Sequence, residues 1–154
     1  MKKIFLLTVV LFSFMSCDRD TIDPNMDQMQ FSATVDDYIF SSPEVDFAIV
    51  NNQRLTITAR DGNRLIILGT SWPVDPGTYV LSYADPYRSQ HFYGLYNYAS
   101  MDYFTDDHTG EITIHTIRSE NNKIVELTAS FAFESFSLSN DHVLVTNGRI
   151  RFGE

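Results

Sequence analysis

The stretch Asp106-Asp107-His108-Thr109-Gly110-Glu111 is the densest cluster of metal-ligating side chains in the sequence. Calcium binds several hard oxygens on one loop, and a glycine permits the sharp bend of such a loop. The stretch lacks the alternation of an oxygen-ligand loop, however, and it lies between two segments with strand character. We therefore expect a solvated hairpin turn with Gly110 at positive φ, and no metal site.

The four histidines, at positions 91, 108, 115 and 142, do not form a ligand pattern, because no two have metal-ligand spacing on one strand face. His115 lies on the same side of its strand as Glu111 and Thr113, so it is expected to face water. No nucleophile elbow, Ser-x-x-Lys, His-Glu-x-x-His, phosphate loop or dinucleotide fingerprint occurs. We expect no cofactor and identify no catalytic residue. A hydrolase remains an alternative, since triads assemble in space.

Aromatic residues are most concentrated between His91 and Phe104, and Trp72 lies in an earlier loop. Tyrosine has an apolar face and a hydroxyl, which suits recognition of a sugar or a protein. Aromatic cross-strand pairs also stabilise sheets, so one face could pack inward while Tyr96 and Tyr98 cover an edge. Both interpretations stay open. The candidate binding face comprises Tyr93, Tyr96, Tyr98, Tyr103 and Trp72.

The only cysteine, Cys17, ends an N-terminal leader. Lys2 and Lys3 precede an apolar run of about twelve residues, which is the layout of a secretory signal. A membrane-spanning helix needs about twenty residues, so the run is too short for one. We expect residues 1–16 to be a signal peptide that is removed before Cys17.

This leader resembles a bacterial lipoprotein signal, in which a small residue precedes an invariant cysteine. Ser16 fits the small position, whereas Phe14 and Met15 depart from the more usual Leu and Ala or Ser. The resemblance implies that Cys17 carries diacylglycerol, and each buried methylene of such chains contributes about 0.8 kcal/mol to anchoring. It also implies a place in a bacterial cell envelope, attached to the outer membrane and facing either the periplasm or the surface.

Residues 17–28 comprise Cys17 and an acidic segment with four aspartates and one proline, which predicts a solvated tether. The segment is similar to the surface-export signal of Bacteroidota lipoproteins; a flexible acidic spacer explains it equally well. Loss of residues 1–16 leaves 138 residues and removes two of the 11 Lys and Arg, so 9 remain against 20 acids and the net charge is −11. This charge argues against nucleic acid and against anionic headgroups as partners. With Cys17 acylated, no thiol remains for disulfides, metal sites or catalysis.

Apolar residues alternate with polar ones from position 29 onward, as in strands that have one buried face. Turn signals separate these runs, notably Asp61–Asn63, Asp75–Gly77 and Asn121–Asn122, and Asn147–Gly148 predicts a bulge or a turn. No stretch of the mature chain favours a helix. We predict one all-β domain at 29–154, a single antiparallel β-sandwich or flattened barrel of roughly ten short strands. The clearest alternating runs are 31–35, 54–60 and 126–133.

Several landmarks also occur in a familiar order: Phe31–Asp37, Leu55–Ala59, Pro76–Tyr79, Thr109–Ile114, Leu127–Phe133 and Val145–Ile150. In this order they resemble a family of small Bacteroidota lipoproteins of unknown function. Asp37 and Ala129 depart from the family pattern, which usually has glycine at both positions. The resemblance implies a β-rich envelope lipoprotein and supplies no activity or substrate.

From these features we expect a non-catalytic binding or interaction module, held at the membrane through the lipid on Cys17, with a protein or a glycan as partner. The alternative is a closed barrel that carries a small apolar ligand, and a hydrolase is a third option. An open aromatic face would favour recognition and a roomy apolar cavity would favour a carrier. A cleft that joins a His, an acid and a Ser or Thr would favour an enzyme.

Overall fold

The computed structural model describes residues 30–82 and 92–153, and of residues 106–108 it describes the backbone alone. The leader, Cys17 and the tether therefore lie outside the described residues, as does His91. Ten strands occur in the described part and no helix, which confirms the all-β prediction. Accordingly, this part contains no helix that is long and apolar enough to cross a bilayer. The strands are β1 (Gln30–Val35), β2 (Tyr38–Ser42), β3 (Val45–Val50), β4 (Arg54–Asp61), β5 (Arg64–Ser71), β6 (Gly77–Leu81), β7 (Tyr93–Tyr98), β8 (Met101–Glu120), β9 (Lys123–Phe136) and β10 (His142–Phe152).

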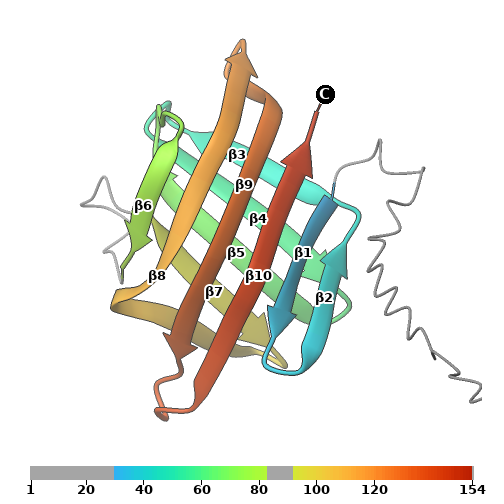
Figure 1. Cartoon of the computed structure of the whole chain (residues 1–154), viewed down its shortest axis with the longest axis vertical. Helices are drawn as coiled ribbons and strands as arrows, with labels where there is room; N and C mark the ends of the chain where they lie inside the picture. Colours follow the sequence, from blue (N-terminus) through green and yellow to red (C-terminus); the bar gives the residue numbers. More distant parts are fainter. Residues whose placement is uncertain (1–29, 83–91, 154) are drawn as a thin grey trace, which may run out of the picture.

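The strands form one antiparallel sheet in the order β2-β1-β10-β9-β8-β7-β5-β4-β3, and β6 pairs with β8. The sheet folds back on itself (Figure 1), so that β6, β8, β9, β10, β1 and β2 form a front layer, with β3, β4, β5 and β7 behind it. The two edges approach each other, because β2 contacts β4 across the layers. The result is a nearly closed, flattened barrel, one of the two architectures that the sequence predicted.

The alternating runs point one set of side chains into the space between the layers, as the sequence predicts. The Phe31 ring lies 5.1 Å from that of Phe131 and 5.8 Å from that of Phe40, measured between centroids. Phe131 in turn stacks on Phe133 at 6.1 Å. All four rings are buried, and each contributes on the order of 2 kcal/mol through burial. Aromatic side chains therefore fill this part of the barrel interior.

The predicted hairpin turns occur where the turn residues indicated. Asn121 and Asn122 both have positive φ, which matches the twist of a two-residue hairpin between β8 and β9. Gly62, at φ 60°, opens the turn between β4 and β5. Asn147 lies at a register shift between Val145 and Gly148, so this pair is a β-bulge within β10.

The hairpin turn predicted at Asp106–Glu111 is wrong. The segment is part of β8, which runs without a break for 20 residues, and its irregularity is a register shift between Thr105 and Gly110. Strand β9 pairs with β8 on both sides of this shift, which holds the segment extended. Gly110 does not have positive φ; a Cβ on it would lie 2.4 Å from the Cβ of Phe133. Close packing, and not turn geometry, explains this glycine. Strands β8, β9 and β10 are accordingly longer than the short strands predicted.

Candidate functional site

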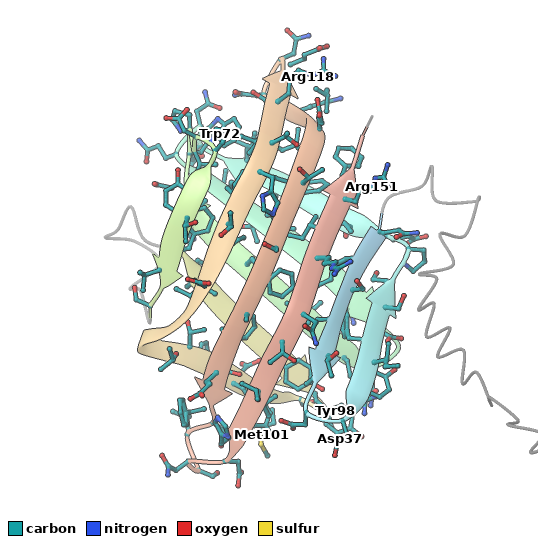
Figure 2. All side chains as sticks on the ribbon, viewed as in Figure 1. Asp37, Trp72, Tyr98, Met101, Arg118 and Arg151 are labelled. Atoms are coloured by element: carbon teal, nitrogen blue, oxygen red, sulfur yellow. The ribbon has the colours of Figure 1, made fainter. Side chains whose placement is uncertain are left out.

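Four turns lie together at one end of the barrel, which we call the turn end: β1–β2, β4–β5, β7–β8 and β9–β10. In Figure 2, Asp37, Tyr98 and Met101 mark this end, and Trp72, Arg118 and Arg151 lie toward the opposite end. Eight large apolar side chains are exposed in the described residues, and five of them belong to these turns or the adjoining strand ends. Exposed apolar groups in one place are the usual mark of a contact surface. The five are Tyr38, Ile39, Tyr98, Met101 and Leu138.

Arg64 lies at the centre of the turn end, between two tyrosine rings. Its guanidinium carbon is 3.6 Å from the ring centroid of Tyr38 and 4.5 Å from that of Tyr98. Strand pairing places Tyr98 directly opposite Arg64 on β7, whereas Tyr38 comes from β2 in the front layer. A cation attracted to both rings therefore joins the two layers at this end of the barrel.

A hydrogen bond fixes the orientation of the Tyr38 ring. The Tyr38 hydroxyl donates to Oδ2 of Asp61 at 2.9 Å, and the backbone N–H of Ser41 donates to the same oxygen at 3.1 Å. The hydrogen bond to Asp61 raises the pKa of Tyr38 above its ordinary value. The β4–β5 hairpin in the back layer is thus hydrogen-bonded to β2 in the front layer.

Tyr96 lies two residues before Tyr98 on β7 and is buried. Burial raises the pKa of the Tyr96 hydroxyl, which forms a hydrogen bond with Arg64. Partial burial alone would lower the pKa of Arg64, but this hydrogen bond and the surrounding tyrosines raise it. Nε of Arg64 is buried without a hydrogen-bond partner among the described residues. Arg64 therefore stays charged, and its guanidinium interacts with the surrounding tyrosines.

The five predicted aromatic residues do not share one face. Tyr96 is only 4% exposed and packs 5.8 Å from half-buried Tyr103, so the expectation that Tyr96 covers an edge is wrong. Tyr93 points outward, and its ring lies over Gly69 of β5, where a Cβ would come within 2.2 Å of it. Trp72 packs against the core near the opposite end. Of the five, only Tyr98, at 40% exposure, belongs to the turn end.

Tyr38, Ile39 and Arg64 were missed because the sequence separates them widely from the tyrosine-rich strand. One signal was available: Tyr38 and Arg64 each follow a turn directly, Asp36–Asp37 in one case and Gly62–Asn63 in the other. Residues next to turns on the same end of a barrel come together when the sheet closes. Closure of the sheet into a barrel was predicted only as one of two architectures, the other being a sandwich.

The remaining sequence predictions concern the exposure of His115 and the metal-ligating side chains. His115 is exposed, as predicted, and one of its ring nitrogens, Nε2, lies 3.1 Å from the Ser130 hydroxyl on the outer face of the front layer. In the described part of the chain, no group of three or more His, Cys, Asp or Glu side chains could hold a metal ion. The side chains of Asp106, Asp107 and His108 lie outside that part. The described groups at the turn end supply flat ring faces, one cation and a hydrogen-bonded carboxylate, which suits contact better than bond cleavage.

The fold and the turn end define this protein as a single-domain, nearly closed antiparallel β-barrel with an exposed aromatic end. The chain belongs to the family described as Domain of unknown function (DUF6252), whose model matches residues 27–151. This match confirms the resemblance to a family of unknown function and covers nearly the whole β-domain. No curated protein and no solved structure matches the chain.

Proposed function

We propose that this protein is a lipid-anchored envelope lipoprotein that acts as a non-catalytic interaction module and contacts a partner protein through the turn end. The observation that carries the proposal is that five exposed apolar side chains belong to the turns of the same end of the barrel as the Arg64 stack. Tyrosine, methionine and arginine are enriched in the centres of protein interfaces, and tyrosine and arginine dominate their binding energy. Exposed Ile39 and Leu138 favour a protein over a glycan, because sugars offer little apolar surface to aliphatic side chains.

The position of the first strand supports this proposal. Gln30 pairs with Arg151, which lies toward the end opposite the turn end (Figure 2). Cys17 precedes Gln30 by thirteen residues, a length that spans at most about 45 Å when fully extended. A tether from a lipid on Cys17 would therefore join the barrel at the opposite end and leave the turn end uncovered.

The filled interior argues against the carrier alternative. Phe131 and Phe133 lie directly over Gly148 and Gly94, where an added Cβ would approach the rings to 2.4 Å and 3.0 Å. Phe31, Phe40 and Phe92 are also almost completely buried. Interiors packed in this way resist the entry of additional groups. An apolar ligand would have to displace core side chains.

The anchor is tested by replacing Cys17 in the full chain. Cys17→Ser should abolish labelling by a fatty-acid analogue and release the protein from membranes, while Ser13→Ala, within the apolar run, should leave both unchanged. Labelling of Cys17→Ser at the level of the unchanged protein would overturn lipidation at this residue.

The contact surface is tested separately, with a photo-cross-linking residue in the cells that make the protein. Placed at position 101, it should cross-link a defined partner; placed at Arg118, on the opposite end, it should not. Tyr98→Ser should lower the yield from position 101 at least tenfold without loss of folded protein. Equal patterns from positions 101 and 118 would overturn the turn end as the contact surface.

A further inference from the structure

A trough crosses the outer face of the front layer, apart from the Arg64 stack. It has a volume of about 580 Å³ and runs over β6, β8, β9 and β10. Ligand sites in proteins typically have volumes of about 300–1,000 Å³, so the trough is large enough for a specific occupant. Its lining residues are Val80, Thr109, Gly110, Glu111, Ala132, Phe133, Glu134 and Leu144.

Backbone irregularities on both sides of β9 explain why this face is hollow. A register shift precedes Gly110 in β8, and another precedes Gly148 in β10. Bulges bend a strand and increase its twist, so both neighbours of β9 depart from a flat sheet here. Between them, β9 directs the small side chain of Ala132 outward, in register with Glu111.

The chemistry of the trough is apolar at both ends and acidic between them. Val80 on β6 is 48% exposed and Leu144 on β10 is 39% exposed. Glu111 and Glu134 are exposed between them, and Glu134 lies 3.6 Å from Nε2 of His142. Among the described residues, no Lys or Arg lines this trough. An occupant that complements these groups carries positive charge together with apolar side chains.

The dimensions favour an extended segment. Neighbouring strands lie about 4.8 Å apart, so the path from β6 to β10 spans about 14 Å. A peptide in extended conformation rises about 3.4 Å per residue, and four or five residues cover that path. Because its side chains alternate in direction, such a peptide can direct every second side chain toward the trough floor.

We propose that the trough binds an extended basic segment of a partner protein, about five residues long. Its Lys or Arg side chains pair with Glu111 and Glu134, and its apolar side chains cover Val80 and Leu144. The inference rests on the proposed function only in that the partner is a protein. The trough is a second contact surface, separate from the Arg64 stack.

The test measures binding of fluorescent peptides to the purified full chain in nonionic detergent, at low salt. Three peptides are compared: Leu-Ser-Lys-Ser-Leu (the Leu–Lys peptide), Ser-Ser-Lys-Ser-Ser (the Ser–Lys peptide) and Leu-Ser-Glu-Ser-Leu (the Leu–Glu peptide), in which the first, third and fifth side chains can face the trough floor together. The Leu–Lys peptide should bind most tightly, and the Leu–Glu peptide should not bind measurably. Equal affinity of the Leu–Lys and Leu–Glu peptides would overturn the proposal.

Variants separate the trough from the general negative charge of the chain. Glu111→Gln with Glu134→Gln should weaken binding of the Leu–Lys peptide about five- to tenfold, as expected for two solvent-exposed ion pairs. The matched control is Glu44→Gln with Asp46→Asn, an exposed pair of acids outside the trough, which should change affinity less than twofold. If the control weakens binding as much as the trough variant does, the attraction is diffuse and the site is refuted.

The apolar ends of the trough are tested with Val80→Ser and Leu144→Ser. Together they should weaken the Leu–Lys peptide and leave the Ser–Lys peptide unchanged, and equal effects on the two would contradict the assigned apolar contacts. All variants are checked for folding by circular dichroism. Cross-linking from position 101 tests the proposed function independently of the trough. If the trough variants leave peptide binding intact while that cross-link persists, only the trough proposal falls.

Discussion

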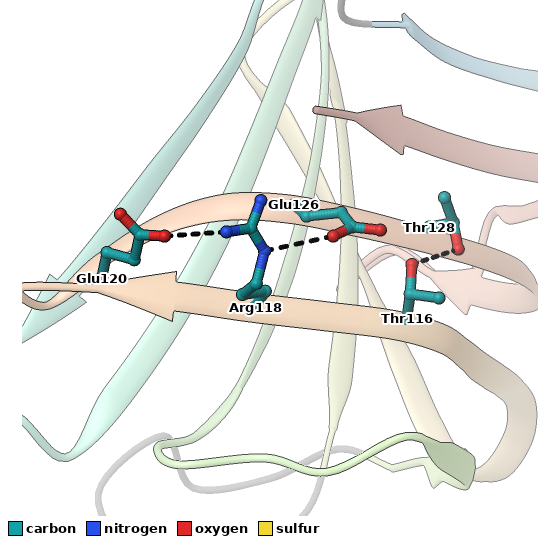
Figure 3. A network of polar contacts seen from close by, with 5 residues as sticks. All are labelled: Thr116, Arg118, Glu120, Glu126 and Thr128. Carbon is teal, nitrogen blue, oxygen red and sulfur yellow. Dashed lines mark hydrogen bonds and ion pairs between the residues drawn. The ribbon is translucent and has the colours of Figure 1, made fainter. Parts of the chain in front are cut away.

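The two ends of the barrel are built from similar hairpins, but one end exposes an ion-pair network and the other exposes aromatic and apolar side chains. Ala99 and Ser100 at the turn end, and Asn121 and Asn122 at the opposite end, all have positive φ, so the backbone geometry is shared. At the opposite end Arg118 contacts Glu120 at 2.7 Å and Glu126 at 3.3 Å (Figure 3). At the turn end, by contrast, Arg64 lies between aromatic rings. The difference therefore lies in the side chains.

This difference shows how an arginine can serve two purposes. The network around Arg118 is solvent-exposed, and each of its ion pairs contributes about 0.2–1 kcal/mol or less to stability. The neighbouring hydroxyls of Thr116 and Thr128 lie 2.7 Å apart and add a further polar pair (Figure 3). Such a surface keeps its hydration. Arg64 instead holds Tyr38 and Tyr98 in place, so that the proposed partner would meet rings that are already ordered.

The largest expected effect concerns two tyrosines of β7, of which Tyr96 is buried and Tyr98 is exposed at the turn end. Tyr96→Ala removes a buried ring and should lower the free energy of unfolding by about 3–5 kcal/mol, because the cavity cannot close completely. Tyr98→Ala removes an exposed ring and should cost clearly less. Urea unfolding of both variants measures the difference. Equal losses would mean that Tyr98 is as much part of the core as Tyr96.

A smaller effect is expected from a matched pair of arginine substitutions. Arg64→Met keeps the apolar stem but removes the cation between the rings, whereas Arg118→Met removes an exposed network. Arg64→Met should therefore lower the urea midpoint more than Arg118→Met does, with the latter costing about 1 kcal/mol or less. If Arg118→Met is the more damaging change, the two ends do not differ as described.

The sequence predicts the strands and most of the turns because these depend on local residue types. Alternation at 31–35 and 126–133 sets which side chains enter the core, and Asn121–Asn122 adopts the positive φ that a tight hairpin requires. The prediction fails at Asp106–Glu111, because Asp and Gly occur both in hairpin turns and in bulges. Only the pairing of β9 along both halves of β8 decides between them, and such pairing is not local.

The turn end and the trough are harder to predict from the order of residues than the strands and turns are. Tyr38, Arg64 and Tyr98 come from three separate hairpins, and they meet only because the sheet closes and brings β2 close to β4 and β5. The tyrosine-rich strand contributes Tyr98 to the turn end, whereas its alternation sends Tyr96 inward and Tyr93 to the outer face of the back layer. The trough depends on two bulges in different strands, of which one was predicted as a turn.

The smallest effect concerns the pH dependence of the turn end. The pKa of Tyr38 is raised by its hydrogen bond to Asp61, and that of Tyr96 by burial. Both hydroxyls are protonated in the folded and unfolded chain at neutral pH, so their contribution is fully present there. Above the usual tyrosine pKa of about 10, the unfolded chain binds fewer protons than the folded chain, and stability should fall as pH rises.

Tyr38→Phe removes one of these two groups, while all other tyrosines are the same in the variant and the unchanged protein. The alkaline fall in stability should therefore be shallower in the variant. Urea unfolding at pH values from 8 to about 11 measures the difference between the two curves. Parallel curves would show that the hydrogen bond between Tyr38 and Asp61 does not persist in solution. The β4–β5 hairpin would then be hydrogen-bonded to β2 only through the backbone N–H of Ser41, and the order of the Tyr38 ring would rest on Arg64 alone.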